Sequence, residues 1–77
     1  MVTGRQHPAE TVGSFVVEGL IEDLLQDSPH SRYLLTKFTF IIIPMVNPDG
    51  VIHGNSRCNL AGLDLNRNWD SEMIKVI

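Results

Sequence analysis

A histidine and a glutamate, His7 and Glu10, lie three residues apart near the start of the sequence. On helical backbone, side chains three residues apart share one face, with Cβ atoms about 5–6 Å apart. Imidazole nitrogens and carboxylate oxygens are both common ligands of zinc, and a catalytic zinc needs three protein ligands and an open position for water. The pair could therefore supply two of those three ligands.

The same pair also has a purely structural interpretation, in which His7 caps a helix and Glu10 is a solvated side chain. Two other histidines, His30 and His53, are further candidates for a third ligand. Cys58, the single cysteine, is a candidate nucleophile with a histidine as its base. The surrounding residues do not favour these last two interpretations.

The composition excludes several classes of protein. Of the 77 residues, 43% are hydrophobic and 19% are charged, which is typical of a globular chain rather than a disordered one. The formal net charge of −3 argues against nucleic acid as a partner, because nucleic-acid-binding domains usually carry a basic stripe. With one cysteine, the chain forms no internal disulfide. No apolar segment approaches the roughly 20 residues of a membrane helix and the first residues lack a signal-peptide core, so we expect a cytoplasmic protein with no membrane partner.

Hydrophobic spacing predicts the elements that position His7 and Glu10. Apolar residues recur at helical spacing after Pro8, and they are numerous enough to predict a helix buried on more than one side. An aromatic and β-branched run further on predicts a strand covered on both faces. The predicted elements are the end of a strand in residues 1–6, a helix over residues 9–26, a short helix over residues 29–35 that starts at Ser28-Pro29, and a buried strand over residues 38–44.

A long segment without regular periodicity follows the predicted strand. It opens with a strong turn signal, Asn47-Pro48-Asp49-Gly50. A loop of this length in a compact domain is usually functional or disordered, and its Asn, Arg and Asp content favours function. We therefore predict a long functional loop over residues 47–70. A strand covered on both faces needs more partners than this chain supplies, so the chain is predicted to be part of a larger α/β domain.

Three groups of residues occur in a specific order along the chain. They are Arg5-Gln6-His7-Pro8-Ala9-Glu10-Thr11, then Ile43-Pro44-Met45-Val46-Asn47-Pro48-Asp49-Gly50-Val51 with Gly54-Asn55-Ser56-Arg57-Cys58, and finally Asp64-Leu65-Asn66-Arg67-Asn68-Trp69. Together they resemble the zinc carboxypeptidase family, most closely its cytosolic branch, over residues 4–70. The resemblance implies an α/β fold with a mixed sheet and flanking helices. Residues 1–77 would then be the incomplete N-terminal portion of a single catalytic domain.

The resemblance also implies roles for individual residues. His7 and Glu10 would be the first two ligands of one zinc ion, Zn2+, and Arg57 would stabilise the oxyanion of the tetrahedral intermediate. Asn66 and Arg67 would bind the terminal carboxylate of a substrate, which a guanidinium matches with two parallel hydrogen bonds. The family's third zinc ligand, a later histidine, and its general-base glutamate are not in this chain. The 77-residue chain alone is therefore expected to be inactive.

Two functions are consistent with these residues. The first is a zinc-dependent metallocarboxypeptidase that removes the C-terminal residue of a peptide or protein. Members of the cytosolic branch remove glutamates from tubulin tails and other acidic C-termini, so the resemblance implies a substrate of this kind. A peptide unrelated to tubulin is the alternative. The second is a non-catalytic pseudoenzyme or fragment that binds a peptide terminus or a protein through Arg57 and Arg67.

Single residues also keep structural alternatives. Arg57 could be a surface arginine, and the Asn66-Arg67 pair could form a turn with a salt bridge to Asp64 or Asp70. Arg5 is expected to be an exposed charge, with contact to an acidic substrate side chain as the alternative.

Overall fold

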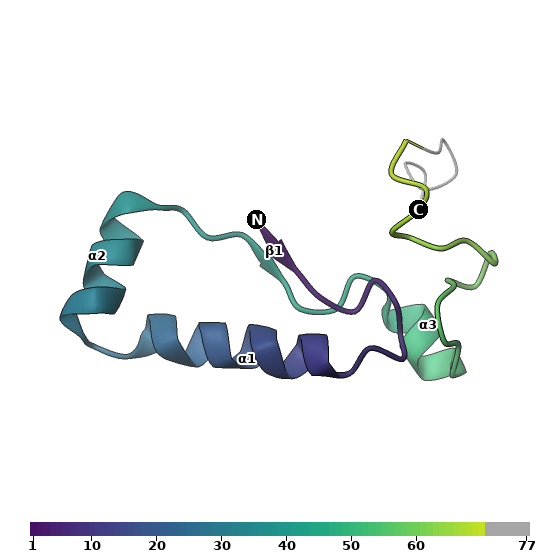
Figure 1. The fold of residues 1–77 in the computed structure, drawn as a ribbon, viewed down its shortest axis with the longest axis horizontal. Coiled ribbons are helices and arrows are strands. Elements are labelled where there is room, and N and C mark those ends of the chain that lie inside the picture. The colour runs from purple at the N-terminus through teal and green to yellow at the C-terminus, as the bar shows by residue number, and fades with distance from the viewer. Residues whose placement is uncertain (71–77) are drawn as a thin grey trace.

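Two short strands and three helices make up the part of the chain that the computed structural model describes, residues 1–70. The elements in chain order are β1 (Val2–Thr3), α1 (Val12–Leu25), α2 (Pro29–Lys37), β2 (Ile42–Ile43) and α3 (Pro48–His53). The strands β1 and β2 pair in parallel, while α1 and α2 meet at the end of the molecule away from α3 (Figure 1). The predicted α/β class is confirmed. The last seven residues of the predicted domain, 71–77, lie outside the described residues.

The predicted first helix is confirmed, but α1 begins at Val12 rather than at residue 9. On one side of α1, Val17 is buried next to Gly4, the residue that follows β1. On its other sides, Val12 and Phe15 are each 71% exposed. The expected burial on more than one side is therefore wrong for the described structure, because residues 1–70 cover only part of the helix surface.

The short helix α2 is confirmed and extends to Lys37, two residues beyond its predicted end. Its start is set locally by a capping box, in which the Ser28 hydroxyl accepts a hydrogen bond from the Ser31 N–H at 3.1 Å. The Ser28 N–H donates in return to the Ser31 hydroxyl at 3.2 Å. Pro29 occupies the first turn, where a missing N–H is tolerated.

Within residues 1–70, no helix has both the length and the apolar character that crossing a membrane requires.

The strand predicted over residues 38–44 is confirmed in position, but it is short and largely uncovered. Only Ile42 and Ile43 are paired, with Val2 and Thr3 respectively. Ile43 itself is 40% exposed. Burial on both faces is wrong for the described residues, because Ile42 is only half-buried and residues 1–70 leave Ile43 exposed.

The predicted loop over residues 47–70 contains a helix, α3, at its start. The side chain of Asn47 caps this helix by accepting a hydrogen bond from the Gly50 N–H at 3.0 Å. Gly54 ends it with a φ of 87°, a left-handed conformation that glycine adopts without a steric penalty. The turn signal in the sequence therefore marks the first turn of a helix. Residues 54–70 are irregular apart from one isolated bridge.

A close contact joins α3 to the segment that carries His7. Asn47 is buried, and its Nδ2 donates to the backbone carbonyl of Gln6 at 3.2 Å. A Cβ atom added to Gly50 would lie 2.6 Å from Pro8 Cγ and 2.7 Å from the backbone oxygen of Cys58. Real Cβ atoms do not approach other atoms this closely. Glycine at position 50 therefore allows three segments to meet.

Replacing Gly50 with alanine in the intact protein is expected to lower the free energy of unfolding by about 1–3 kcal/mol, because the new methyl group overlaps its neighbours. Gly19→Ala is the matched control, since Gly19 also lies in a helix and, among residues 1–70, no atom lies within 4 Å of a Cβ added there. Helix propensity predicts that this control is more stable by about 1 kcal/mol. Urea denaturation measures both values. Similar effects of the two substitutions would contradict the close contact at Gly50.

Candidate active site

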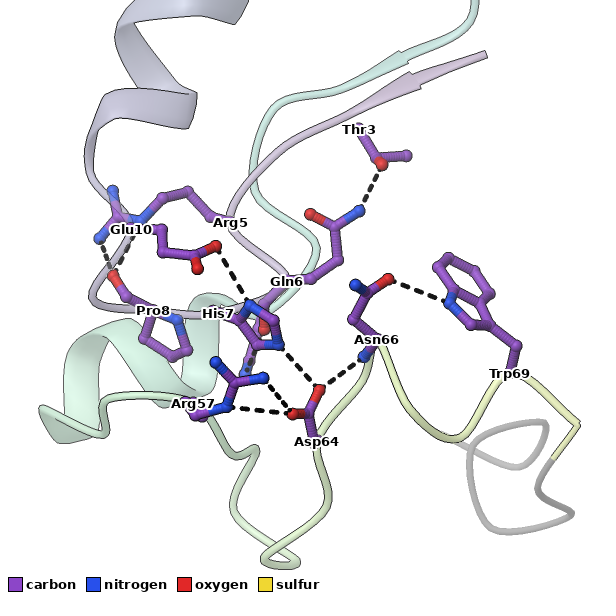
Figure 2. Close-up of polar contacts among 11 residues, drawn as sticks. Thr3, Arg5, Gln6, His7, Pro8, Glu10, Arg57, Asp64, Asn66 and Trp69 are labelled. Atoms are coloured by element: carbon purple, nitrogen blue, oxygen red, sulfur yellow. Dashed lines mark hydrogen bonds and ion pairs between the residues drawn. The ribbon is translucent and has the colours of Figure 1, made fainter.

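His7 and Glu10 converge in the turn that precedes α1 (Figure 2). His7 Nδ1 lies 3.1 Å from Glu10 Oε2. The His7 side chain is only 8% exposed, whereas that of Glu10 is 66% exposed. Their approach comes from a turn closed by a hydrogen bond of 3.1 Å from the Glu10 N–H to the His7 carbonyl. The helical backbone expected at this pair is absent, because α1 starts only at Val12.

The geometry of this pair suits two ligands of one zinc ion. Typical zinc–nitrogen and zinc–oxygen bonds place two ligands of a tetrahedral ion about 3.4 Å apart. The observed separation of 3.1 Å between His7 Nδ1 and Glu10 Oε2 is close to that value. Within residues 1–70, however, no group of three His, Cys, Asp or Glu side chains is placed to hold a metal ion. Neither His30 nor His53 completes the site in the described structure.

Asp64 contacts the other side of the His7 ring. Its Oδ1 lies 2.8 Å from His7 Nε2 and also accepts a hydrogen bond from the Asn66 N–H at 2.9 Å. If Nε2 carries the proton and donates to Asp64, Nδ1 keeps its lone pair for a metal. A carboxylate in this place fixes the orientation and the tautomer of the ring. From the sequence, Asp64 is expected only as a salt-bridge partner of Arg67, and its position just before Asn66-Arg67 is the signal that could have marked it.

Arg57 binds the second oxygen of the same carboxylate. Its Nε and Nη2 donate to Asp64 Oδ2 at 3.2 and 2.9 Å. The Arg57 side chain is 49% exposed, and its Nη1 has no hydrogen-bond partner among residues 1–70. One carboxylate therefore links the histidine to the arginine, although 57 residues separate His7 from Asp64 in the sequence.

Asp64 is ionised at neutral pH. Partial burial by itself raises its pKa, but the hydrogen bonds from His7, from the Asn66 N–H and from Arg57 together outweigh burial and lower the pKa to about 2. The side chain is 17% exposed. Asp64 can therefore accept hydrogen bonds from His7 and Arg57 at the same time.

Asn66 and Arg67 follow Asp64 in a turn closed by a hydrogen bond of 3.1 Å from the Arg67 N–H to the Asp64 carbonyl. Asn66 Oδ1 accepts a hydrogen bond from Trp69 Nε1 at 3.1 Å (Figure 2). The carboxylate of Asp64 pairs with Arg57 and not with Arg67, so that salt bridge, one of the structural alternatives, is wrong. The backbone N–H of Asn66 contacts Asp64. Within residues 1–70, the Arg67 side chain forms no hydrogen bond with His7, Arg57 or Asp64.

A cavity of about 430 Å³ opens beside Arg57. It is lined by residues 55–60 together with His53 and Gly62. Cys58 is half-buried in this lining, and no hydrogen bond joins it to His53 in the described part of the chain. His7 also makes no contact with this thiol, because its two ring nitrogens face Glu10 and Asp64. A thiol nucleophile therefore gains no support from the structure.

Comparison with known proteins gives the same family as the sequence motifs. The family model described as zinc carboxypeptidase matches residues 1–76. The chain is 55% identical over 71 residues to "Cytosolic carboxypeptidase 2" of Danio rerio. The aligned region covers 92% of this chain and 10% of that protein. It is 52% identical over 69 residues to "Cytosolic carboxypeptidase 4" of Homo sapiens, and this region covers 90% of this chain and 6% of that protein. It is 53% identical over 68 residues to "Cytosolic carboxypeptidase 6" of Mus musculus, and this region covers 88% of this chain and 13% of that protein. The chain thus spans about a tenth of the length of these curated relatives.

Proposed function

Since this chain belongs to the zinc carboxypeptidase family, we propose that it is part of a metallocarboxypeptidase that hydrolyses the C-terminal residue of a peptide or protein. One observation carries the proposal. Two side chains of the types that zinc prefers, His7 and Glu10, lie 3.1 Å apart, and an ionised carboxylate, Asp64, lies 2.8 Å from the far nitrogen of the histidine. These contacts support a metal-binding role for His7, with Asp64 as the residue that orients its ring.

In this proposal His7 Nδ1 and Glu10 Oε2 hold one zinc ion. No three-residue metal group is found within residues 1–70. The third ligand and the general base therefore come from outside these residues. When bound, the ion supplies Lewis-acid chemistry, which activates water and polarises the scissile carbonyl. Asp64 holds the His7 ring in the orientation and tautomer that present Nδ1 to the metal.

Arg57 stabilises the negative charge that develops on the carbonyl oxygen as water attacks. Asp64 holds the Nε and Nη2 side of the guanidinium, which fixes the plane of the group. The Nη1 side then stays available to donate to the oxyanion. A cation positioned before the reaction needs no reorganisation during it, and this is the main advantage of such a group.

Asn66 and Arg67 bind the terminal carboxylate of the substrate. Because Trp69 already donates to Asn66 Oδ1, the amide nitrogen Nδ2 is the polar side-chain atom of Asn66 that would bind the substrate. Nδ2 is a donor, as a carboxylate requires, and the Arg67 guanidinium supplies two parallel donors. An enzyme that holds a free C-terminus in this way removes the last residue and does not cut within the chain.

Residues 1–70 belong, in our proposal, to a larger α/β domain. Their radius of gyration of 14.9 Å exceeds the about 11 Å typical of a compact chain of this length. Large apolar side chains are uncovered, among them Phe15 at 71%, Leu25 at 80% and Ile52 at 86% exposure. Other segments of the same domain would cover these side chains. We also propose a cytoplasmic location, which the names of the relatives support.

A pair of peptides that differ only at the C-terminus tests the function. The intact, zinc-loaded protein is expected to release the last residue of a peptide with a free carboxylate. Release from the C-terminally amidated peptide should be slower by on the order of 100-fold, because Arg67 loses its charged partner. A chelator should abolish both rates. Cleavage within the chain, or equal rates for the two peptides, would contradict the proposal, and binding of the free-acid peptide without release would favour the non-catalytic alternative.

The substrate class is proposed to be acidic C-termini, such as the glutamate-rich tails of tubulin. The support for this is the resemblance to the cytosolic branch. Peptides that end in glutamate and in leucine, with otherwise identical sequences, separate this narrower proposal from the general one. A higher kcat/KM for leucine would refute the preference for glutamate and leave the carboxypeptidase function intact.

A further inference from the structure

The backbone just before His7 has an unusual conformation. Arg5 has a φ of 58°, and it is the only non-glycine residue with a positive φ in the described part of the chain. Such conformations are uncommon for residues with a Cβ atom, and they persist where the surrounding structure enforces them. Here the Gly4 N–H donates to the Ile43 carbonyl at 3.0 Å, and the Arg5 carbonyl accepts from the Asn47 N–H at 3.2 Å. The backbone at Arg5 is thus fixed on both sides.

The side chain of Arg5 turns back onto the segment that carries His7 and Glu10 (Figure 2). Its Nε and Nη2 both donate to the carbonyl of Pro8, at 2.9 and 2.6 Å. Its Nη1 donates to Ser14 Oγ at 3.0 Å. The expectation of an exposed charge at Arg5 is therefore wrong, because this side chain is part-buried and bonded to its own chain.

The Pro8 carbonyl oxygen, to which Arg5 donates, is well placed to control the spacing of His7 and Glu10. Pro8 directly follows His7 and lies within the turn that Glu10 closes. Pro8 is buried, and its ring packs closely against Gly50 of α3. Two contacts therefore hold this turn in place: Gly50 packs against the ring of Pro8, and Arg5 donates to the Pro8 carbonyl. A planar guanidinium can hold one carbonyl with two donors and still reach Ser14, and a lysine ammonium lacks that fixed fork.

We propose that Arg5 is a positioning residue that sets the zinc affinity of the site by fixing the turn between His7 and Glu10. This inference rests on the proposed zinc site. Arg5 touches neither ligand side chain in this role, and it acts through the Pro8 carbonyl. The two ligand atoms are already 3.1 Å apart in the described structure, so the arginine holds the turn in a conformation that the metal can use.

Competition with a chromophoric chelator measures the zinc affinity of the intact protein and of its variants. Arg5→Gly removes the side-chain contacts but accepts a positive φ without strain, so the backbone is spared. We expect this variant to bind zinc at least about tenfold more weakly, within the range found for residues that orient metal ligands. Arg5→Lys should also weaken binding, because it keeps the charge and loses the fork. Arg32→Ala is the matched control, since within residues 1–70 the Arg32 side chain pairs with exposed Asp27, away from His7 and Glu10. This variant should bind zinc as the wild type does.

Two further measurements separate the ways in which this inference could fail. Retention of zinc by His7→Ala would refute the proposed site itself. Loss of zinc in His7→Ala together with wild-type affinity in Arg5→Gly would overturn only the role of Arg5. Thermal unfolding of the zinc-free variants identifies general structural damage, and a lower Tm with unchanged zinc affinity would also overturn the positioning role. If Arg5→Gly does not fold, Arg5→Lys provides the same comparison.

Discussion

Replacing His7 with alanine in the intact protein is expected to weaken zinc binding by more than about 100-fold, beyond the range for residues that only orient a ligand. Carboxypeptidase activity should disappear with the metal. His7 is one of the two proposed ligands, and its Nδ1 lies 3.1 Å from Oε2 of the other, Glu10. The Glu10 carboxylate, whose side chain is 66% exposed, and the proposed third ligand would remain, which is one protein ligand fewer than a catalytic zinc needs. Zinc content after dialysis and hydrolysis of a free-acid peptide measure the two effects.

Glu10→Gln should have a similar effect, because a neutral amide oxygen is a weaker zinc ligand than a carboxylate. Asp64→Asn provides a graded comparison, since Asp64 contacts His7 Nε2 and not the proposed ligand atoms, His7 Nδ1 and Glu10 Oε2. Its expected loss of zinc affinity is about 10–100-fold. Asp27→Asn is the matched control, because it removes the same charge from an exposed ion pair with Arg32. Full activity in Glu10→Gln would refute the ligand assignment, and wild-type zinc affinity in Asp64→Asn would refute the orienting role of Asp64.

The second large effect is expected for Arg57→Ala, which should lower kcat about 10²–10³-fold, or about 2.7–4 kcal/mol in transition-state stabilisation. Zinc affinity should fall less than in Asp64→Asn, since Asp64 keeps its contact with His7 through Oδ1 when Arg57 is lost. The loss falls on kcat because the charge that Arg57 stabilises develops on the carbonyl oxygen only as the reaction proceeds. Steady-state kinetics on a free-acid peptide give kcat and KM separately.

Arg67→Ala is the contrasting variant. The terminal carboxylate carries its charge in the ground state and in the transition state alike, so loss of its partner should raise KM more than it lowers kcat. An increase in KM alone for Arg57→Ala would contradict the oxyanion role. It would place Arg57 among the residues that bind substrate, whereas unchanged kcat and KM would favour the structural alternative of a surface arginine.

The sequence determined those features that depend on neighbouring residues. Ser28 and Pro29 predict the start of α2 because the capping box joins residues three apart, and the structure has that box. The helix α1 follows from its hydrophobic spacing. The ordered motifs identify the family because they require only residue types and order. The roles of His7 and Glu10 as ligands stay predictions, although the structure places these two side chains together.

The tertiary structure decided the contacts that join distant segments. The path of the irregular segment after α3 brings Asp64 back to His7 across 57 residues, and no local pattern encodes that distance. The same return explains why Gly50 must lack a Cβ atom, since Pro8 and Cys58 meet there. The part-buried guanidinium of Arg5 likewise depends on where the turn lies against α1. Local backbone preferences act over a few residues, whereas these side chains obtain their partners only when the chain folds back on itself.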